Sequence, residues 1–405
     1  MKKGLFLLLL LLTGCLPTAL PTVPATLHPT LSPVISPLAS STSIIKKIST
    51  PTHIAQSSAT PAPTSDIKYL RRCVRVEAQD TALADVTSGA IVQDNLLWDI
   101  QTGKKYPLRT TRSFHSFDVI DRHGLQVSPD RKMFAYLEAL RSGRQVLWVV
   151  NARAEMLAKI SFRRNDLETP RWLDNERLAF YTAQTDMDGS VLVVNPFTQE
   201  QSVVSDELPI LNFPYARKST VITWLLEYSP DLNSVVYLDN HGGVSLRDVL
   251  TKKTLWNSDN GGVYGNPVWS PDGQQVAVVG NGQIYLIDRS GQAKPILEET
   301  TDAFPTAPSW SPDGRKVAFW DSIHLMVYDL QTGEVVDLCV YNQPETLTYP
   351  ARWSPDSRQL IIADLISVNP MLITPRVIDL QKNVMYKNIL DGQNIRSEVW
   401  MNSMP

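Results

Sequence analysis

A turn motif that begins with an aromatic residue recurs along this chain, and it constrains the fold more than any other feature. Three copies are nearly identical: Trp269-Ser-Pro-Asp-Gly273, Trp310-Ser-Pro-Asp-Gly314 and Trp353-Ser-Pro-Asp-Ser357. Weaker copies occur at 127–130 and 228–231, and a degenerate one at 172–175, so that neighbouring copies are 41 to 57 residues apart. A period of this length indicates a repeat architecture, in which each unit buries its apolar face against the next unit.

Each residue type of the motif has a role in a turn that leads into a strand. Proline presets φ for the first central position, Asp hydrogen-bonds nearby amides, and Gly tolerates positive φ. An apolar run follows every copy, and the preceding Trp or Tyr offers a large body for packing between units. We therefore expect the repeated aspartates to cap turns rather than to act as catalytic carboxylates: Asp130, Asp231, Asp272, Asp313 and Asp356.

A second pattern gives the same period. Apolar runs end in an Asp or Asn at seven places, several of which continue into a turn and another strand: Asp99, Asn151, Asn195, Asp248, Asp288, Asp329 and Asp379. Seven hairpins but only six Ser-Pro-Asp-type turns leave the first hairpin, 91–108, without a partner. The C-terminal stretch 397–402 resembles the strand and turn that this hairpin lacks. We predict a ring in which the last strand joins the first hairpin and thereby removes both sheet edges.

These units resemble WD40-like β-propeller repeats of the TolB type, which occur in exported bacterial proteins. The resemblance covers about 340 residues and is strongest over 266–379. It implies an all-β propeller over 67–405, with four antiparallel strands per blade. The hairpin count favours seven blades, with six as the alternative. TolB-type propellers have six blades and a separate N-terminal α/β domain; a Pro/Thr-rich segment stands in that place here, so TolB's cellular role is not carried over.

The N-terminus predicts export. Two lysines, an apolar run from Leu5 to Leu12 and then Thr13-Gly14-Cys15 form the parts of a secretory signal, and the run is too short to span a bilayer. Leu12-Thr-Gly-Cys15 resembles a bacterial lipobox, so we expect residues 1–14 to be removed and Cys15 to carry lipids. An ordinary signal peptide with a chance cysteine is the alternative. The lipobox reading places the protein in the bacterial cell envelope, extracytoplasmic and lipid-anchored to a membrane.

Residues 15–66 form the next predicted segment. Beyond Cys15 it is dominated by Pro, Thr, Ser and Ala, contains no aromatic residue and carries almost no charge. Such a composition cannot bury enough apolar area to offset the entropy of ordering, so we predict a disordered tether between the anchor and the ring.

Charge and cysteine content exclude several classes of protein. The net charge of −3 and the pI of about 6.1 argue against nucleic acid as a partner. Three cysteines are too few for a disulfide-built scaffold or a thiolate metal cage. For Cys73 and Cys339 we expect two unpaired, buried thiols. A disulfide is the alternative, and it would need Cα atoms closer than about 7 Å.

The sequence contains no recognisable combination of catalytic residues. No Gly-x-Ser-x-Gly elbow occurs, and the histidines of the predicted ring are scattered: His115, His123, His241 and His324. Residues 185–190 resemble half of a calcium loop but lack its later ligands, so an Asp-Gly hairpin turn explains them better. We expect no cofactor and no metal site.

The leading functional hypothesis is a membrane-anchored, non-catalytic module that binds or scaffolds an envelope protein. A carbohydrate or small-ligand binding protein is the alternative, and a propeller enzyme such as a polysaccharide lyase is a third. Long stretches at 206–226 and 365–372 are where interface anchors would lie. The competing interpretation, of equal weight, is that they only cover a blade edge.

Overall fold

The chain divides into two units, residues 1–60 and 61–405, and every residue described below belongs to the second unit. The computed structural model describes residues 67–77, 85–93, 96–108, 126–140, 143–163, 167, 170–181, 191–204, 226–239, 243–258, 266–280, 282–297, 306–322, 324–341, 350–368, 371–386 and 400–402. No helix in these ranges is long and apolar enough to cross a membrane.

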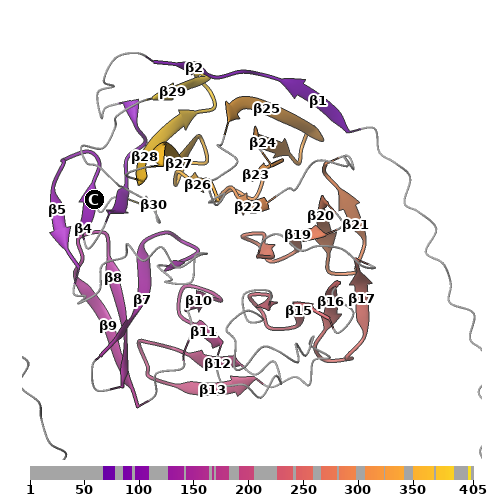
Figure 1. The fold of residues 1–405 in the computed structure, drawn as a ribbon. Helices are drawn as coiled ribbons and strands as arrows, with labels where there is room; N and C mark the ends of the chain where they lie inside the picture. The colour runs from indigo at the N-terminus through magenta and orange to yellow at the C-terminus, as the bar shows by residue number, and fades with distance from the viewer. Residues whose placement is uncertain are drawn as a thin grey trace, which may run out of the picture. The chain divides into compact units, whose positions relative to one another are not determined.

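Seven separate β-sheets are arranged in a closed ring, which is the β-propeller architecture (Figure 1). We number the blades along the chain and give the strands of each from the ring centre outward. Blade 1 contains β30 (Trp400–Met401), β3 (Ala90–Gln93), β4 (Leu96–Asp99) and β5 (Lys105–Pro107). Blade 2 contains β6 (Gln126–Val127), β7 (Met133–Ala139), β8 (Gln145–Asn151) and β9 (Met156–Phe162). Blade 3 contains β10 (Arg171–Trp172), β11 (Leu178–Tyr181), β12 (Val191–Val194) and β13 (Gln201–Val204).

The remaining four blades repeat this plan. Blade 4 contains β14 (Glu227–Tyr228), β15 (Ser234–Leu238), β16 (Val244–Asp248) and β17 (Thr254–Asn257), and blade 5 contains β18 (Val268–Trp269), β19 (Gln275–Gly280), β20 (Gln283–Asp288) and β21 (Ala293–Pro295). Blade 6 contains β22 (Thr306–Trp310), β23 (Lys316–Trp320), β24 (His324–Asp329) and β25 (Glu334–Tyr341). Blade 7 contains β26 (Arg352–Trp353), β27 (Gln359–Val368), β28 (Met371–Asp379) and β29 (Val384–Tyr386). The predicted seven blades of four antiparallel strands are confirmed.

The ring closes as the hairpin count predicts. Strand β30 pairs antiparallel with β3, with Trp400 opposite Ile91 and Met401 opposite Ala90. The next residue, Asn402, donates its backbone N–H to the Arg131 carbonyl at 2.9 Å and its side-chain N–H to the Asp130 carbonyl, also at 2.9 Å. The C-terminal strand therefore completes blade 1, and Asn402 fastens it to the first turn of blade 2.

The hydrophobic core consists of seven clusters, one between each pair of neighbouring blades. Phe134 and Tyr136 of blade 2, for example, pack against Leu97 and Met401 of blade 1. Both faces of a blade are covered in this way, so the two middle strands of a blade are rich in apolar residues; all of Gln145–Asn151 in β8 is buried. Stability consequently depends on contacts between neighbouring units, as in other repeat folds.

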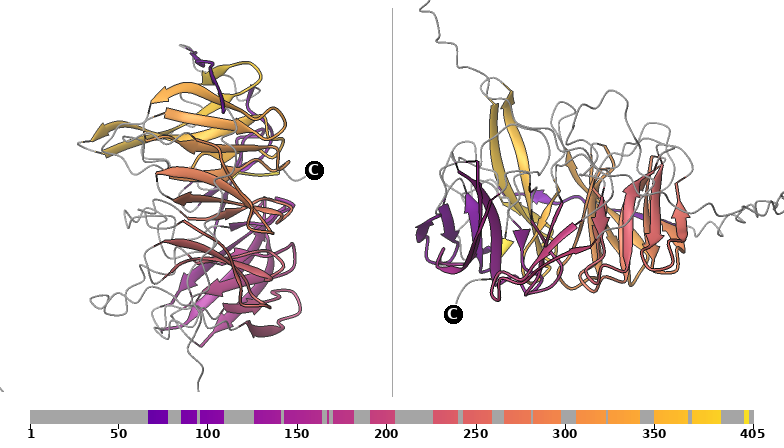
Figure 2. Two further views of the ribbon diagram at one scale, coloured as in Figure 1. Left: turned by 90° about the vertical axis from the view of Figure 1, so that its right-hand side faces the viewer. Right: turned by 90° about the horizontal axis from the view of Figure 1, so that it is seen from below.

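Two features depart from the regular plan. Two short strands, β1 (Lys68–Arg71) and β2 (Arg75–Val76), add a fifth, parallel strand to the outer edges of blades 6 and 7. We call residues 67–77 the strap; Figure 1 shows it passing outside β25 and β29. In blade 7, β27 and β28 form a hairpin that projects beyond the other blades on one side of the ring (Figure 2).

The projecting hairpin corrects one sequence-based expectation. Residues 365–372 were expected to form a long loop between two strands. Instead, pairing continues from Asp364 opposite Thr374 to Val368 opposite Met371, with one irregularity near Leu365. Only residues 369–370 lie between the two strands. We call residues 365–373 the arm.

Candidate functional site

The repeated aspartates are turn caps, as predicted. In the five copies of the motif with a Ser-Pro-Asp core, the serine hydroxyl donates to the aspartate at 2.6 Å. The same carboxylate oxygen accepts the backbone N–H two residues later, at Lys132, Asn233, Gln274, Arg315 and Arg358. These hydrogen bonds engage the carboxylates in the turns.

The Asp and Asn residues that end the third strand of each blade act in the same way. All seven accept backbone amides of the following turn, as Asp329 does from Gln331 and Thr332. The regular spacing and these hydrogen bonds account for each of them as a turn residue.

The motif tryptophans connect neighbouring blades by hydrogen bonds as well as by packing. The indole N–H donates to an inner-strand carbonyl of the preceding blade in four cases: Trp172 to Gln126 (2.8 Å), Trp269 to Glu227 (3.4 Å), Trp310 to Val268 (2.9 Å) and Trp353 to Ser309 (3.1 Å). We call these contacts indole bridges. They explain why a tryptophan, which carries a donor at its far edge, occupies this position rather than phenylalanine.

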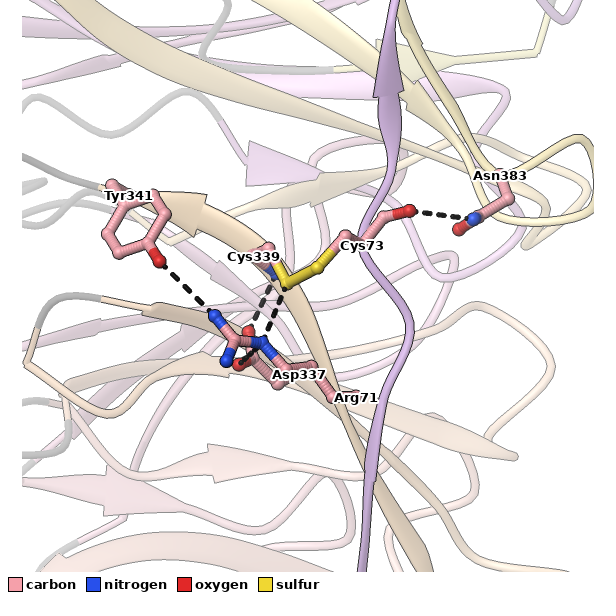
Figure 3. The surroundings of a disulfide bond; sticks show 6 residues. All are labelled: Arg71, Cys73, Asp337, Cys339, Tyr341 and Asn383. Carbon is pink, nitrogen blue, oxygen red and sulfur yellow. Dashed lines mark hydrogen bonds and ion pairs between the residues drawn. A yellow bond between two sulfur atoms is a disulfide. The ribbon is translucent and has the colours of Figure 1, made fainter.

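A disulfide joins Cys73 of the strap to Cys339 of β25, so the expectation of two unpaired, buried thiols is wrong (Figure 3). Their Cα atoms are 4.7 Å apart. Cys73 is exposed and Cys339 is half-buried. The pairing arises because β1 lies parallel to β25, with Arg71 opposite Asp337, which brings the next residues of the two segments together.

Polar contacts hold the strap on both sides of the disulfide. Arg71 donates to the Cys339 sulfur at 3.3 Å and to the Tyr341 hydroxyl at 3.4 Å, and its Nε lies 3.7 Å from the Asp337 carboxylate (Figure 3). Lys68 forms an ion pair with Glu334. Beyond the disulfide, Asn383 donates to the Cys73 carbonyl at 2.8 Å. The strap is therefore fixed to two blades by backbone pairing and to one of them by a covalent bond.

The first residue of each short inner strand lies at the inner edge of the ring. Arg171 of blade 3 and Glu227 of blade 4 meet there, with Arg171 Nε 2.5 Å from Glu227 Oε2. Burial raises the pKa of Glu227 to about 7, although the neighbouring guanidinium favours the charged form. This partly buried pair joins two adjacent blades.

The remaining candidates from the sequence are placed as follows. His324 begins β24; its Nδ1 lies 3.4 Å from an Asp321 carboxylate oxygen, and its ring packs edge-on against Tyr341. Cys15, the other three histidines of the predicted ring, residues 185–190 and nearly all of 206–226 lie outside the described residues. Among the residues that are described, no group of three or more His, Cys, Asp or Glu side chains could hold a metal ion.

Comparison with known proteins identifies no family for this chain. No family model matches the chain, and no curated protein matches it. Among solved structures, the β-propeller domain of Myceliophteria thermophila Cps50 (Swd1) is similar with a TM-score of 0.42 and 10% identity, covering 69% of this chain and 93% of that one. Kluyveromyces lactis Hsv2 is similar with a TM-score of 0.42 and 13% identity, covering 64% and 73%. Neither likeness carries an argument about function.

Proposed function

We propose that this protein is an exported, lipid-anchored module whose ring binds an envelope protein and catalyses no reaction. The observation that carries the proposal is the Cys73–Cys339 disulfide, which clamps the start of the ring to its outer rim. Disulfides persist in oxidising compartments and are rare in the cytosol. The bond therefore supports the export that the lysine-led apolar N-terminus and Cys15 predict.

The position of the clamp suits a tethered domain. The strap is the first described segment after the Pro/Thr-rich stretch, and it is held to blades 6 and 7 before the chain enters blade 1. A pull applied through residues 15–66 would reach the disulfide and the two parallel strand pairings before it reached blade 1. The ring would thus be protected against opening from its N-terminal end.

The arm of blade 7 is the candidate interface for the partner. It projects beyond the other blades, and its sequence has no charged residue between Asp364 and Arg376 (Figure 2). Depletion of charge is a feature of protein interface cores. A ring that is rigid through seven packed interfaces would present this hairpin with little entropy cost on binding.

The anchor is tested by fractionation. A Cys15→Ala variant should leave the membrane fraction, because no diacylglyceryl group can be attached to alanine. A Cys73→Ser, Cys339→Ser variant serves as the matched control and should stay with the membrane. Membrane association unchanged by Cys15→Ala would contradict the anchor.

The partner is tested by mild crosslinking of the full chain in envelope extract, followed by mass spectrometry. In a shortened-arm variant, residues 365–373 are replaced by Asn-Gly, since Asp364 and Thr374 already pair and a two-residue turn can join them. The control replaces residues 140–144 of blade 2 by Asn-Gly, next to the pair Ala139–Gln145. We expect one reproducible protein that the control retains and the shortened arm loses. Equal capture by both variants would refute the arm as the interface.

A further inference from the structure

The turns that join the third and fourth strands of the blades lie on one face of the ring. We call them the outer turns: residues 100–104, 152–155, 195–200, 249–253, 289–292, 330–333 and 380–383. Strands alternate in direction and every blade has the same strand order, so these turns share one side of the closed ring. The arm, which joins the second and third strands of blade 7, projects from the opposite side (Figure 2). Because all seven outer turns are described, their equivalent positions can be compared directly.

Two neighbouring outer turns carry a large apolar side chain where the other five carry a polar one. The second residue after the strand-ending Asp or Asn is Phe197 in blade 3, 44% exposed, and Leu250 in blade 4, 87% exposed. Blade 2 exposes Met156 and Leu157 directly after its outer turn. Three adjacent blades therefore present apolar side chains on the same face. The polar residues at the equivalent position of the other blades are Gln101, Arg153, Ser290, Gln331 and Gln381.

The backbone of the two turns is held in place while their apolar side chains remain exposed. Asn195 accepts the backbone N–H of Phe197 at 2.9 Å, and Asp248 accepts that of Thr251 at 2.6 Å. Neither Phe197 nor Leu250 belongs to the clusters that form the described core between blades. Single exposed apolar residues are common on protein surfaces, so the informative observation is the shared position in neighbouring blades. Packing within the ring does not account for an apolar residue at that position.

Charge favours a lipid surface as the contact. Leu250 is followed in the same turn by Lys252 and Lys253, and all three are exposed. Apolar side chains beside lysines are typical of segments that bind anionic membranes, because the apolar groups enter the headgroup region and the lysines are attracted to lipid phosphates. The outer turn of blade 3 carries Glu200 instead, so the electrostatic attraction is assigned to blade 4.

The strap begins on this face of the ring as well. Its residue Lys68 pairs with Glu334, which directly follows the outer turn of blade 6. The end of the ring that continues toward Cys15 therefore lies on the face that exposes Phe197 and Leu250. Apolar side chains that come from separate turns but share one face suit a planar surface better than a partner that needs a continuous pocket.

We propose that the ring rests on an anionic membrane surface through the outer turns of blades 2 to 4, with Phe197 and Leu250 among the lipid headgroups. Lys252 and Lys253 then lie close to lipid phosphate groups. This contact rests on the lipid anchor proposed above, which would hold the ring near a bilayer. The arm lies on the opposite face and would point away from the membrane, where it is accessible to a protein partner.

The test measures flotation with vesicles of the mature chain expected after cleavage, residues 15–405, with Cys15→Ala so that no lipid is attached. The vesicles contain phosphatidylcholine alone or phosphatidylcholine with phosphatidylglycerol. We expect the chain to float with the anionic vesicles. Phe197→Ser with Leu250→Ser should weaken this binding by about tenfold, because apolar area is no longer buried. Lys252→Gln with Lys253→Gln should weaken it by roughly 20-fold, and only on the anionic vesicles.

Leu140→Ser is the matched control, because Leu140 is an exposed leucine that follows the second strand of blade 2 and so lies on the opposite face. It should bind vesicles as the parent chain does, and all variants should keep the parent's Tm. Absence of flotation, or equal binding by the parent and the Phe197, Leu250 variant, would overturn the contact. Loss of a dimer in that variant, with vesicle binding unchanged, would assign the turns to a protein contact and overturn it as well.

Failure of the anchor is a separate outcome, because the chain in the vesicle assay carries no lipid. Membrane association of the native protein that survives Cys15→Ala would refute the anchor. Flotation that depends on Phe197 and Leu250 would still support the contact through the outer turns.

Discussion

Replacing both cysteines of the clamp, Cys73→Ser with Cys339→Ser, should lower the stability of the whole ring rather than free the strap alone. The two residues are separated by 266 positions, so the bond closes a loop that contains three of the four strands of blade 1, all of blades 2 to 5 and most of blade 6. In the unfolded chain this loop restricts conformational freedom, and the restriction raises the free energy of unfolding.

The magnitude follows from the length of the loop. The chain-entropy relation for a loop of this size gives about 5.6 kcal/mol at 25 °C, and measured disulfides more often contribute about 2–4 kcal/mol. We expect a loss of about 3–5 kcal/mol, which lowers the Tm of a domain of this size by roughly 5 °C. The strap retains its backbone pairing with β25 and β29 in the variant, so the native ring itself should be unchanged.

Guanidinium unfolding followed by tryptophan fluorescence and far-UV circular dichroism measures this loss. The unaltered protein treated with a reductant provides the second arm and should match the serine variant. A free energy of unfolding within about 1 kcal/mol of the unaltered protein would refute the reasoning. It would mean that the disulfide does not lower the conformational entropy of the unfolded chain enough to stabilise the folded ring.

Three further changes test the ring. Trp353→Phe removes the indole bridge to Ser309 and should cost about 1–3 kcal/mol in the same unfolding assay, because a half-buried carbonyl loses its donor; a cost under about 0.5 kcal/mol would show that the bridge contributes only packing. Glu227 has its pKa raised by burial from 4.5 to about 7, so the unfolded chain releases this proton first and stability falls as pH rises from about 4.5 to 7. In Glu227→Gln the free energy of unfolding should lack this fall of about 3 kcal/mol between pH 4.5 and 7. Identical curves of stability against pH for the variant and the unaltered protein would contradict the raised pKa of Glu227. Gly89→Ala brings its methyl group into a clash with the Met401 carbonyl oxygen and should cost about 1–3 kcal/mol through loss of closure. Gly103→Ala, at positive φ with open space around it, should cost only about 1 kcal/mol, and equal losses would refute the clash.

The ring could be predicted from the sequence because its determinants are local and repeated. Each Ser-Pro-Asp turn and each strand-ending Asp or Asn bonds amides within a few residues, so the pattern is visible without tertiary information. Closure by Trp400 and Met401 followed from counting, since one hairpin lacked an inner strand.

The strap could not be predicted in the same way. Its strands are four and two residues long and mostly exposed. They are held by backbone hydrogen bonds, which do not require particular residue types and so cannot be recognised in the sequence. The disulfide pairs residues from opposite ends of the ring sequence, and only the parallel register of β1 on β25 brings them together. The arm was also missed: residues 365–372 were expected to be a loop, but only residues 369–370 lie between the strands, which continue on both sides.

The contact of Arg131 with two other blades could not be predicted from its place in the turn motif. Arg131 stands where glycine stands in the closest copies of the motif, so its backbone adopts positive φ without the help of glycine. Leu232 and Ser357 do the same in two other copies. What distinguishes Arg131 is the reach of its side chain to two other blades, and this emerges only once the ring is closed.

Non-reducing peptide mapping of the mature protein, isolated from its native membrane after alkylation of free thiols, tests the central claim of an exported, anchored and clamped ring. The account predicts that the chain starts at a lipid-modified Cys15 and that Cys73 and Cys339 are recovered in one linked peptide. A chain that retains Met1 with an unmodified Cys15, and in which Cys73 and Cys339 are both alkylated, would contradict it.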